Sequence, residues 1–352
     1  MAISETPAIP LGSWVLVTGI NGLVGSHVAD QLLAHGYRVR GTVRNAQRCA
    51  WVRDLFCRKY GDEAFQLVQV EDLSIPGAFD EAIKGVSGVV HVATILEGLD
   101  PKELFAAISQ LDRNVLTSAA AEPSVKRFVY TSSTQAASTI ALDDLEDKPV
   151  TSDSWNEVAI QKAETGSPSD HKRYFNVYSA SKALSERGVW DWVKQHKPGF
   201  AINTVLPSMC FGASVDPEHQ GHASTSIWPA AIFKNELESV RSSIDALIPI
   251  GAYCVDIRDV GLLHVAGLTN PTVQNERLFA YGTPFFWSDV IAVFRKLFPG
   301  REFPDNFPDQ DRKVNLLEVE PDKRSEELLR EMGKSGWTSL EEILMANVSD
   351  LV

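Results

Sequence analysis

The stretch Trp14-Val-Leu-Val-Thr-Gly19-Ile-Asn-Gly22-Leu-Val-Gly25 decides the fold of this chain. Residues 14–18 have the composition of a buried strand, and the apolar periodicity of Leu23 to His35 predicts a helix. A glycine turn between a strand and a helix lets backbone N–H groups and the helix dipole hold a pyrophosphate. A glycine trio also occurs in ordinary turns, but the flanking strand and helix favour a dinucleotide site.

The same alternation continues along the first part of the chain. Further strands are predicted at residues 37–42, 65–70, 88–92, 126–130 and 201–206. Helical stretches separate them, and a long helix is predicted at 174–195. This pattern is typical of a parallel sheet with helices on both faces, so the predicted fold class is α/β, a Rossmann-type doubly wound parallel sheet.

The residues after the second predicted strand distinguish between the two nicotinamide cofactors. An acid about 20 residues on would bind the adenosine ribose of NAD(H), yet no Asp or Glu occurs between Asp30 and Asp54. The interval carries five arginines instead, and Arg44 directly follows the strand, where a 2′-phosphate would lie. The sequence therefore predicts NADP(H). A solvated helix face is the alternative, and it suits Arg53 and Arg38 better than Arg44.

A second motif, Tyr178-Ser-Ala-Ser-Lys182, lies near the start of the long helix. Its i,i+4 spacing puts the phenol and the ammonium group on the same helical face. A nearby lysine favours phenolate, so we expect it to lower the pKa of Tyr178 from its usual value of about 10. Such a tyrosine can donate a proton to a carbonyl oxygen. The spacing is common by chance, and its place after the glycine motif makes it informative.

The fifth predicted strand ends in Thr131-Ser132-Ser133. Ligands of a parallel sheet gather at the carboxyl ends of its strands, so a serine hydroxyl there can hold a reacting oxygen. Adjacent side chains of an extended segment point in opposite directions, and one serine is expected to face the site. In the alternative interpretation, both hydroxyls bind backbone groups at the strand end.

Taken in order, these motifs resemble the extended short-chain dehydrogenase/reductase family over essentially the full chain. The segments Leu16–Gly22, Arg127–Ser133 and Val177–Lys182 are similar to those of fungal NADPH-dependent aldehyde and ketone reductases and, more distantly, of dihydroflavonol reductases. The resemblance implies an NADP(H)-dependent carbonyl reductase. Such an enzyme reduces small aldehydes or ketones to alcohols, with a hydride from the nicotinamide and a proton from the tyrosine.

The resemblance also implies roles for individual residues. Tyr178 would be the proton donor, Lys182 would bind the nicotinamide ribose, and Ser133 would orient the carbonyl oxygen. Asn114 lies in a helix that supplies a further Asn in the wider superfamily, and its role stays open. The cofactor-binding residues expected from the motifs and the resemblance are Gly19, Asn21, Gly22, Leu23, Val24, Gly25, Arg44, Asp72, Leu73, Ala93, Tyr178, Lys182 and Pro207.

Two other functions are weaker hypotheses. Sugar-nucleotide epimerases and dehydratases of this family usually carry an Arg and an Asn near the end of the sixth strand, where this chain reads Leu206-Pro-Ser-Met-Cys-Phe-Gly212. A non-catalytic nucleotide-sensing protein would not need the Tyr178, Lys182 and Ser133 set. The natural carbonyl compound, the stereochemistry of the alcohol and the direction in cells stay open.

Composition argues against several other classes. The 352 residues are 44% hydrophobic, and their formal net charge of -13 opposes a nucleic-acid partner. No run approaches the roughly 18 apolar residues of a membrane span, and residues 1–12 lack a signal-peptide pattern. The four scattered cysteines fit reduced thiols. His219-x-x-His222 lacks nearby partner ligands. We therefore expect a cytoplasmic monomer or homodimer without a metal.

The pattern also predicts how the chain is divided. Residues 1–207 are expected to form mainly the NADP(H)-binding domain with the catalytic residues. Beyond Pro207 the pattern is irregular, with short helices predicted at 288–298 and 339–346. Residues 208–352 are thus expected to form mainly a smaller substrate-binding lobe, interwoven with the sheet. The acidic segment 141–170 is expected to be a surface excursion.

Overall fold

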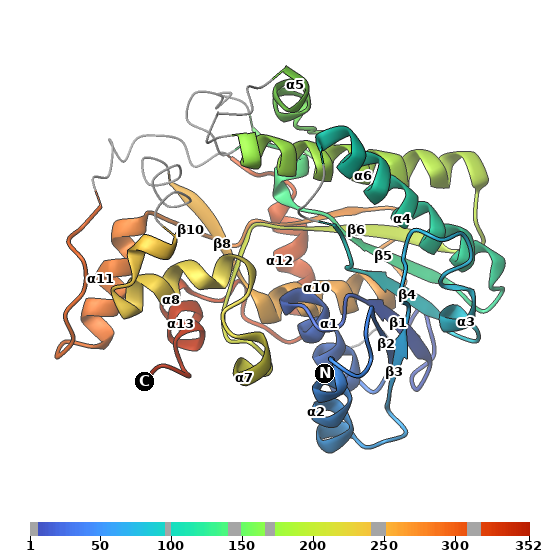
Figure 1. Cartoon of the computed structure of the whole chain (residues 1–352), viewed down its shortest axis with the longest axis horizontal. Coiled ribbons are helices and arrows are strands. Elements are labelled where there is room, and N and C mark those ends of the chain that lie inside the picture. Colours follow the sequence, from blue (N-terminus) through green and yellow to red (C-terminus); the bar gives the residue numbers. More distant parts are fainter. Residues whose placement is uncertain (1–5, 96–99, 140–148, 166–172, 241–250, 308–317) are drawn as a thin grey trace.

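The computed structural model describes residues 6–95, 100–139, 149–165, 173–240, 251–307 and 318–352, and its centre is one parallel sheet (Figure 1). Seven strands form this sheet in the order β3-β2-β1-β4-β5-β6-β9. The predicted Rossmann-type fold is confirmed. The strands are β1 (Trp14–Thr18), β2 (Arg38–Val43), β3 (Phe65–Gln69), β4 (Gly88–His91), β5 (Arg127–Thr131), β6 (Ala201–Pro207) and β9 (Arg277–Ala280).

Helices cover both faces of the sheet (Figure 1). Alternation along β1 shows why: Val15 and Val17 belong to the core shared with α1 and α10, whereas Leu16 belongs to the core shared with α4 and α6. Helix α5 packs against α6. The helices on one face of the sheet are α3 (Asp80–Ile83), α4 (Pro101–Ala121), α5 (Glu157–Thr165) and α6 (Arg173–His196). The helices on the opposite face are α1 (Leu23–Ala34), α2 (Ala50–Tyr60), α10 (Ile257–Thr269) and α12 (Asp322–Glu331).

A second, smaller unit lies beside the carboxyl ends of the strands (Figure 1). It contains a three-stranded sheet in the order β10-β8-β7, which was not predicted from the sequence because two of its strands have only three residues. Phe211, Phe285 and Trp287 are fully buried in its aromatic core. Its elements are β7 (Met209–Phe211), α7 (Pro217–Gln220), α8 (Ile227–Lys234), β8 (Ala252–Asp256), β10 (Thr283–Phe285), α11 (Trp287–Leu297) and α13 (Leu340–Asn347).

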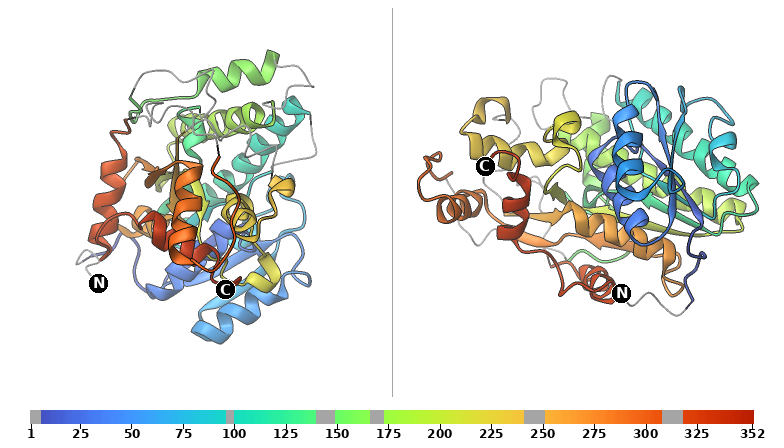
Figure 2. Two further views of the ribbon diagram at one scale, coloured as in Figure 1. Left: turned by 90° about the vertical axis from the view of Figure 1, so that its left-hand side faces the viewer. Right: turned by 90° about the horizontal axis from the view of Figure 1, so that it is seen from below.

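Strand β9 and helices α10 and α12, all from beyond residue 207, return to the main sheet. Strand β9 pairs in parallel with β6, with Leu278 opposite Val205. Helix α10 packs against α1, as the orange and blue helices of Figure 2 (right) show. The chain therefore passes between the two units more than once, and the division at residue 207 stays a prediction.

Most predicted bounds lie within two residues of the observed ones. The strand expected at 37–42 is Arg38–Val43, and the helix expected at 174–195 is Arg173–His196. The helix expected at 339–346 is Leu340–Asn347, and the Ser339 hydroxyl caps its start by accepting the Glu342 N–H. Much of the acidic segment 141–170 lies outside the described residues. In the part of the chain described, no helix is long and apolar enough to cross a membrane.

Candidate active site

The glycine-rich turn has the geometry of a phosphate cradle. Gly19 has a φ of +65°, and a Cβ atom on Gly25 would lie 2.3 Å from the Gly19 carbonyl oxygen, so neither position accepts a side chain. Helix α1 starts at Leu23 with no side-chain cap and no acid in its first turn. Its first N–H groups thus suit an anion, and these residues fit the pyrophosphate of a dinucleotide.

The end of β4 lies directly against this turn. The Thr18 hydroxyl oxygen accepts the N–H groups of Val92 and Ala93, each at 3.0 Å. A Cβ atom on Gly19 would lie 3.1 Å from Ala93. The structure therefore brings together two separate parts of the predicted cofactor site.

The second unit contacts the glycine turn, which the sequence did not predict. Gln220 of α7 donates from Nε2 to the Asn21 carbonyl oxygen and to Ser26 Oγ, both at 3.1 Å. Its neighbour His219 stacks on Trp51 of α2, with ring centroids 5.2 Å apart. Gln220 and Asn21 are 199 positions apart, so no local sequence pattern predicts their contact. Helix α7 thus lies over the rim of the glycine turn.

The arginines after β2 separate into different environments. Arg38 donates to the Gly12 carbonyl oxygen at 2.7 Å, Arg40 donates to two carbonyl oxygens at 2.8 Å, and Arg53 pairs with Asp54. Arg44 directly follows β2 and is exposed. Arg44 therefore lies exposed at the carboxyl end of β2, and its contact with a 2′-phosphate stays a prediction.

The loop after β3 is held from α4. The Asp72 carboxylate accepts the Ser74 N–H at 2.8 Å and the Ser74 hydroxyl at 2.6 Å, which holds the pKa of Asp72 below its usual value. Asn114 Nδ2 donates to the Leu73 carbonyl oxygen at 2.9 Å. Asn114 thus holds the backbone of the loop that carries Asp72 and Leu73, and whether it joins the catalytic set stays open.

The predicted catalytic residues meet at the carboxyl ends of β5 and β6. The Ser133 side chain lies against the Tyr178 phenol and opposes the rise of its pKa. The Ser133 hydroxyl donates to the Pro207 carbonyl oxygen at 3.4 Å. Lys182 Nζ donates to the Thr131 carbonyl oxygen at 3.5 Å. The neighbouring Ser132 hydroxyl instead donates to a buried glutamate on α6 at 2.7 Å. Of the two serines, Ser133 alone contacts the tyrosine.

The pKa of Tyr178 shifts in the direction opposite to the one expected. Burial raises it to about 12, and the Ser133 hydrogen bond opposes this shift without reversing it. The prediction that Lys182 lowers the pKa of Tyr178 is wrong, because desolvation of the phenolate is the largest effect. Burial likewise lowers the pKa of Lys182, opposed by Asp112 and Glu186. The phenol is protonated at neutral pH, as a proton donor must be.

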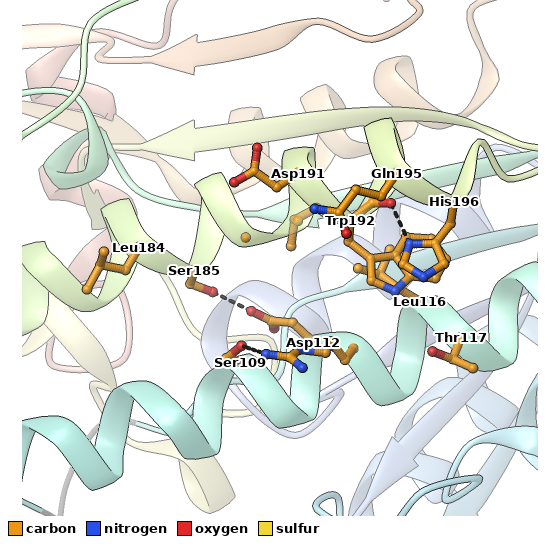
Figure 3. Close-up of a pocket in the computed structure, with 13 residues that line it drawn as sticks. Ser109, Asp112, Leu116, Thr117, Leu184, Ser185, Asp191, Trp192, Gln195 and His196 are labelled. Carbon is orange, nitrogen blue, oxygen red and sulfur yellow. Dashed lines mark hydrogen bonds between the residues drawn. The ribbon is translucent and has the colours of Figure 1, made fainter.

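A cavity of about 510 Å³ lies elsewhere, between α4 and α6 (Figure 3). Asp112 and Ser185 line it, and none of the predicted site residues does. Among the described residues, no three His, Cys, Asp or Glu side chains are grouped so that they could hold a metal. The predicted cofactor and catalytic residues therefore form a different site from this cavity.

Comparison with known proteins adds an independent finding. The model of the NAD dependent epimerase/dehydratase family matches residues 15–244. The chain belongs to this family. The predicted resemblance to extended short-chain dehydrogenases/reductases is thereby confirmed.

Relatives within the family include named reductases. The chain is 40% identical to aldehyde reductase 2 of Sporidiobolus salmonicolor, over 100% of this chain and 98% of that protein. It is 34% identical to the ketoreductase adrE of Penicillium rubens, over 99% of both. Yeast methylglyoxal/isovaleraldehyde reductase Gre2, complexed with NADPH, has the same fold with a TM-score of 0.76 at 21% identity, over 96% of this chain and 98% of that one.

Proposed function

We propose that this protein is an NADP(H)-dependent carbonyl reductase that converts aldehydes and ketones to alcohols. The observation that carries the proposal is that Ser133, Tyr178 and Lys182 meet at the carboxyl ends of β5 and β6, the edge of the sheet where the glycine turn also lies. The aldehyde reductase and ketoreductase relatives support it. Membership of the NAD dependent epimerase/dehydratase family agrees with a nicotinamide cofactor.

The cofactor would be held by the residues that fit it. The N–H groups at the start of α1 would bind the pyrophosphate, and Arg44 would bind the adenosine 2′-phosphate. Asp72 and Leu73 would contact the adenine, and Ala93 and Pro207 would border the rest of the cofactor. When bound, NADPH supplies the hydride. The NADPH complex of the Gre2 neighbour supports this choice of cofactor.

Three side chains would act on the carbonyl group. Ser133 would donate a hydrogen bond that orients the carbonyl oxygen, and Tyr178 would donate its proton to that oxygen. The high pKa of Tyr178 keeps the proton available, and the Lys182 ammonium group would stabilise the phenolate left behind. Residues 208–352 would supply most of the substrate contacts. The cytoplasmic location and the monomeric or dimeric state stay predictions.

The test is the loss of NADPH absorbance on mixing purified protein with aldehydes and ketones of varied size. We expect turnover with NADPH and much slower turnover with NADH. No NADPH loss across the panel would overturn the proposal. Retained oxidised cofactor with no net consumption would instead support the epimerase hypothesis.

A further inference from the structure

The chain between β7 and α8 forms a loop that reaches from the second unit to the glycine turn. The loop runs from Gly212 to Ser226 and carries α7 near its middle. One side chain of α13 holds both of its ends: Asn347 Oδ1 accepts the Gly212 N–H at 2.9 Å, and Nδ2 donates to the Ser226 carbonyl oxygen at 3.0 Å. Asn347 is fully buried, so the base of the loop is fixed.

The middle of the loop is closed on itself. The Ser214 hydroxyl donates to the Gly221 carbonyl oxygen, which joins the two sides of the loop. Between them, the Asp216 carboxylate caps α7 by accepting the His219 N–H at 3.1 Å. Residues 214–221 therefore form a compact unit, which we call the clasp.

The clasp contacts the proposed cofactor site at two points. Gln220 Nε2 donates to the Asn21 carbonyl oxygen and to Ser26 Oγ, both at 3.1 Å. The His219 ring stacks on Trp51 of α2, with centroids 5.2 Å apart and planes 9° from parallel. Asn21 belongs to the turn proposed to bind the diphosphate, and α2 follows the arginine proposed to bind the 2′-phosphate. The clasp, which lies between the second unit and α1 (Figure 1), thus joins both phosphate-binding parts of the site.

These contacts at the tip are weaker than the ones at the base. Gln220 is partly exposed and His219 is exposed, whereas Asn347 is fully buried. A neutral hydrogen bond near the surface contributes little net free energy, because water replaces it when it breaks. A buried amide that loses its partners gains no such replacement. The clasp can therefore leave the glycine turn while the base of the loop stays in place.

The backbone of Gly221 determines where the clasp turns back towards the base. Its φ is +56° and its ψ is −154°, a combination that essentially only glycine adopts. Apart from its adjacent residues, no heavy atom lies within 4 Å of the place that a Cβ atom would take. Gly221 is therefore required by the path of the backbone and not by packing. A side chain here would strain the closed clasp without displacing a neighbour.

We propose that residues 214–221 are a clasp on the phosphate-binding side of the cofactor site, which must release the glycine turn and Trp51 before the cofactor leaves. The identity of the cofactor as NADP(H) rests on the proposed function. Gln220 and His219 are positioning residues in this proposal, because they hold the clasp closed. Since the base of the loop is fixed at Asn347, opening the clasp does not require the sheet of the second unit to move.

Gly221→Ala tests the clasp without removing any of its contacts. The strained backbone disfavours the closed clasp, so NADP+ should leave about five times faster in stopped-flow fluorescence. NAD+ should also leave faster, because the clasp does not depend on the 2′-phosphate. Gly85→Ala is the control: Gly85 also has a positive φ and room for a Cβ atom, but it precedes the amino end of β4. An unchanged release rate in Gly221→Ala, or equal acceleration in both variants, would overturn the proposal.

Hydrogen–deuterium exchange measures the clasp without any activity. At saturating NADP+, amide exchange in residues 214–221 of the wild-type protein should be slower than in the free protein, because the closed clasp opens less often. In Gly221→Ala this protection should be largely lost, while β7 and α8 exchange as in the wild-type protein. Equal exchange with and without NADP+ would refute the clasp. If NADP+ protected the clasp but no carbonyl compound consumed NADPH, the proposed function would fail and the clasp would stand.

Discussion

The two ends of the predicted cofactor site are built in different ways. The glycine turn is made of contiguous residues, Gly19 to Gly25, and works through its backbone. The proposed catalytic end joins Ser133 at the end of β5 with Tyr178 and Lys182 of α6, and would work through a buried charge and hydroxyl groups. The first end should therefore be sensitive to added volume, and the second to a lost proton or charge.

The largest expected effect is at the catalytic end. Tyr178→Phe removes the proposed proton donor, and kcat/KM for carbonyl reduction should fall by about a thousandfold. NADPH affinity, measured by fluorescence titration, should stay close to that of the wild-type protein. Tyr174→Phe changes an exposed phenol one turn earlier on α6 and serves as the control. Full activity in Tyr178→Phe would contradict the mechanism.

The next effect is steric and belongs to the glycine turn. In Gly25→Ala the new Cβ atom would lie 2.3 Å from the Gly19 carbonyl oxygen. Overpacking of this kind should lower the free energy of unfolding by about 2 kcal/mol, measured in denaturant without cofactor. In Gly22→Ala the corresponding distance is 3.5 Å, an ordinary contact, so its stability should change little. Equal stabilities of the two variants would show that the turn is not this tight.

A smaller effect concerns the choice of cofactor. Arg44→Ala should weaken NADPH binding about tenfold, because a hydrogen-bonded charge pair with the 2′-phosphate is lost. NADH lacks that phosphate, so its affinity should be unchanged in the same titration. Arg53→Ala removes the same charge from a surface ion pair with Asp54 and should leave both affinities as they are. A parallel loss of NADH binding would argue against the assigned role.

The smallest effect should come from the contact between the two units. Gln220→Ala removes two neutral hydrogen bonds at the rim of the glycine turn, and NADPH affinity should fall only about threefold. The rate of NADPH release by stopped-flow fluorescence measures this change. Gln274→Ala alters an exposed side chain that bonds locally to Pro271 and is the control. An unchanged release rate in Gln220→Ala would leave α7 without a part in holding the cofactor.

Local patterns were enough to predict six of the seven strands of the main sheet and the glycine turn. The strand β1, the glycine run and α1 follow one another in the chain, and their periodicity depends on nearest neighbours. The same holds for the long helix that carries Tyr178 and Lys182. Short strands such as β7 and β9 were missed because they are stable only when paired with distant strands.

The sequence by itself determined the fold class, the nucleotide motif and the set of candidate catalytic residues, because each depends on residues close together in the chain. Only the tertiary structure showed that burial raises the pKa of Tyr178 and that Arg277 already pairs with Glu186. It also joined Asp112 of α4 to Ser185 of α6. Desolvation and charge pairing depend on which distant segments exclude water from a group, and the spacing of residues along the chain does not predict which segments these are.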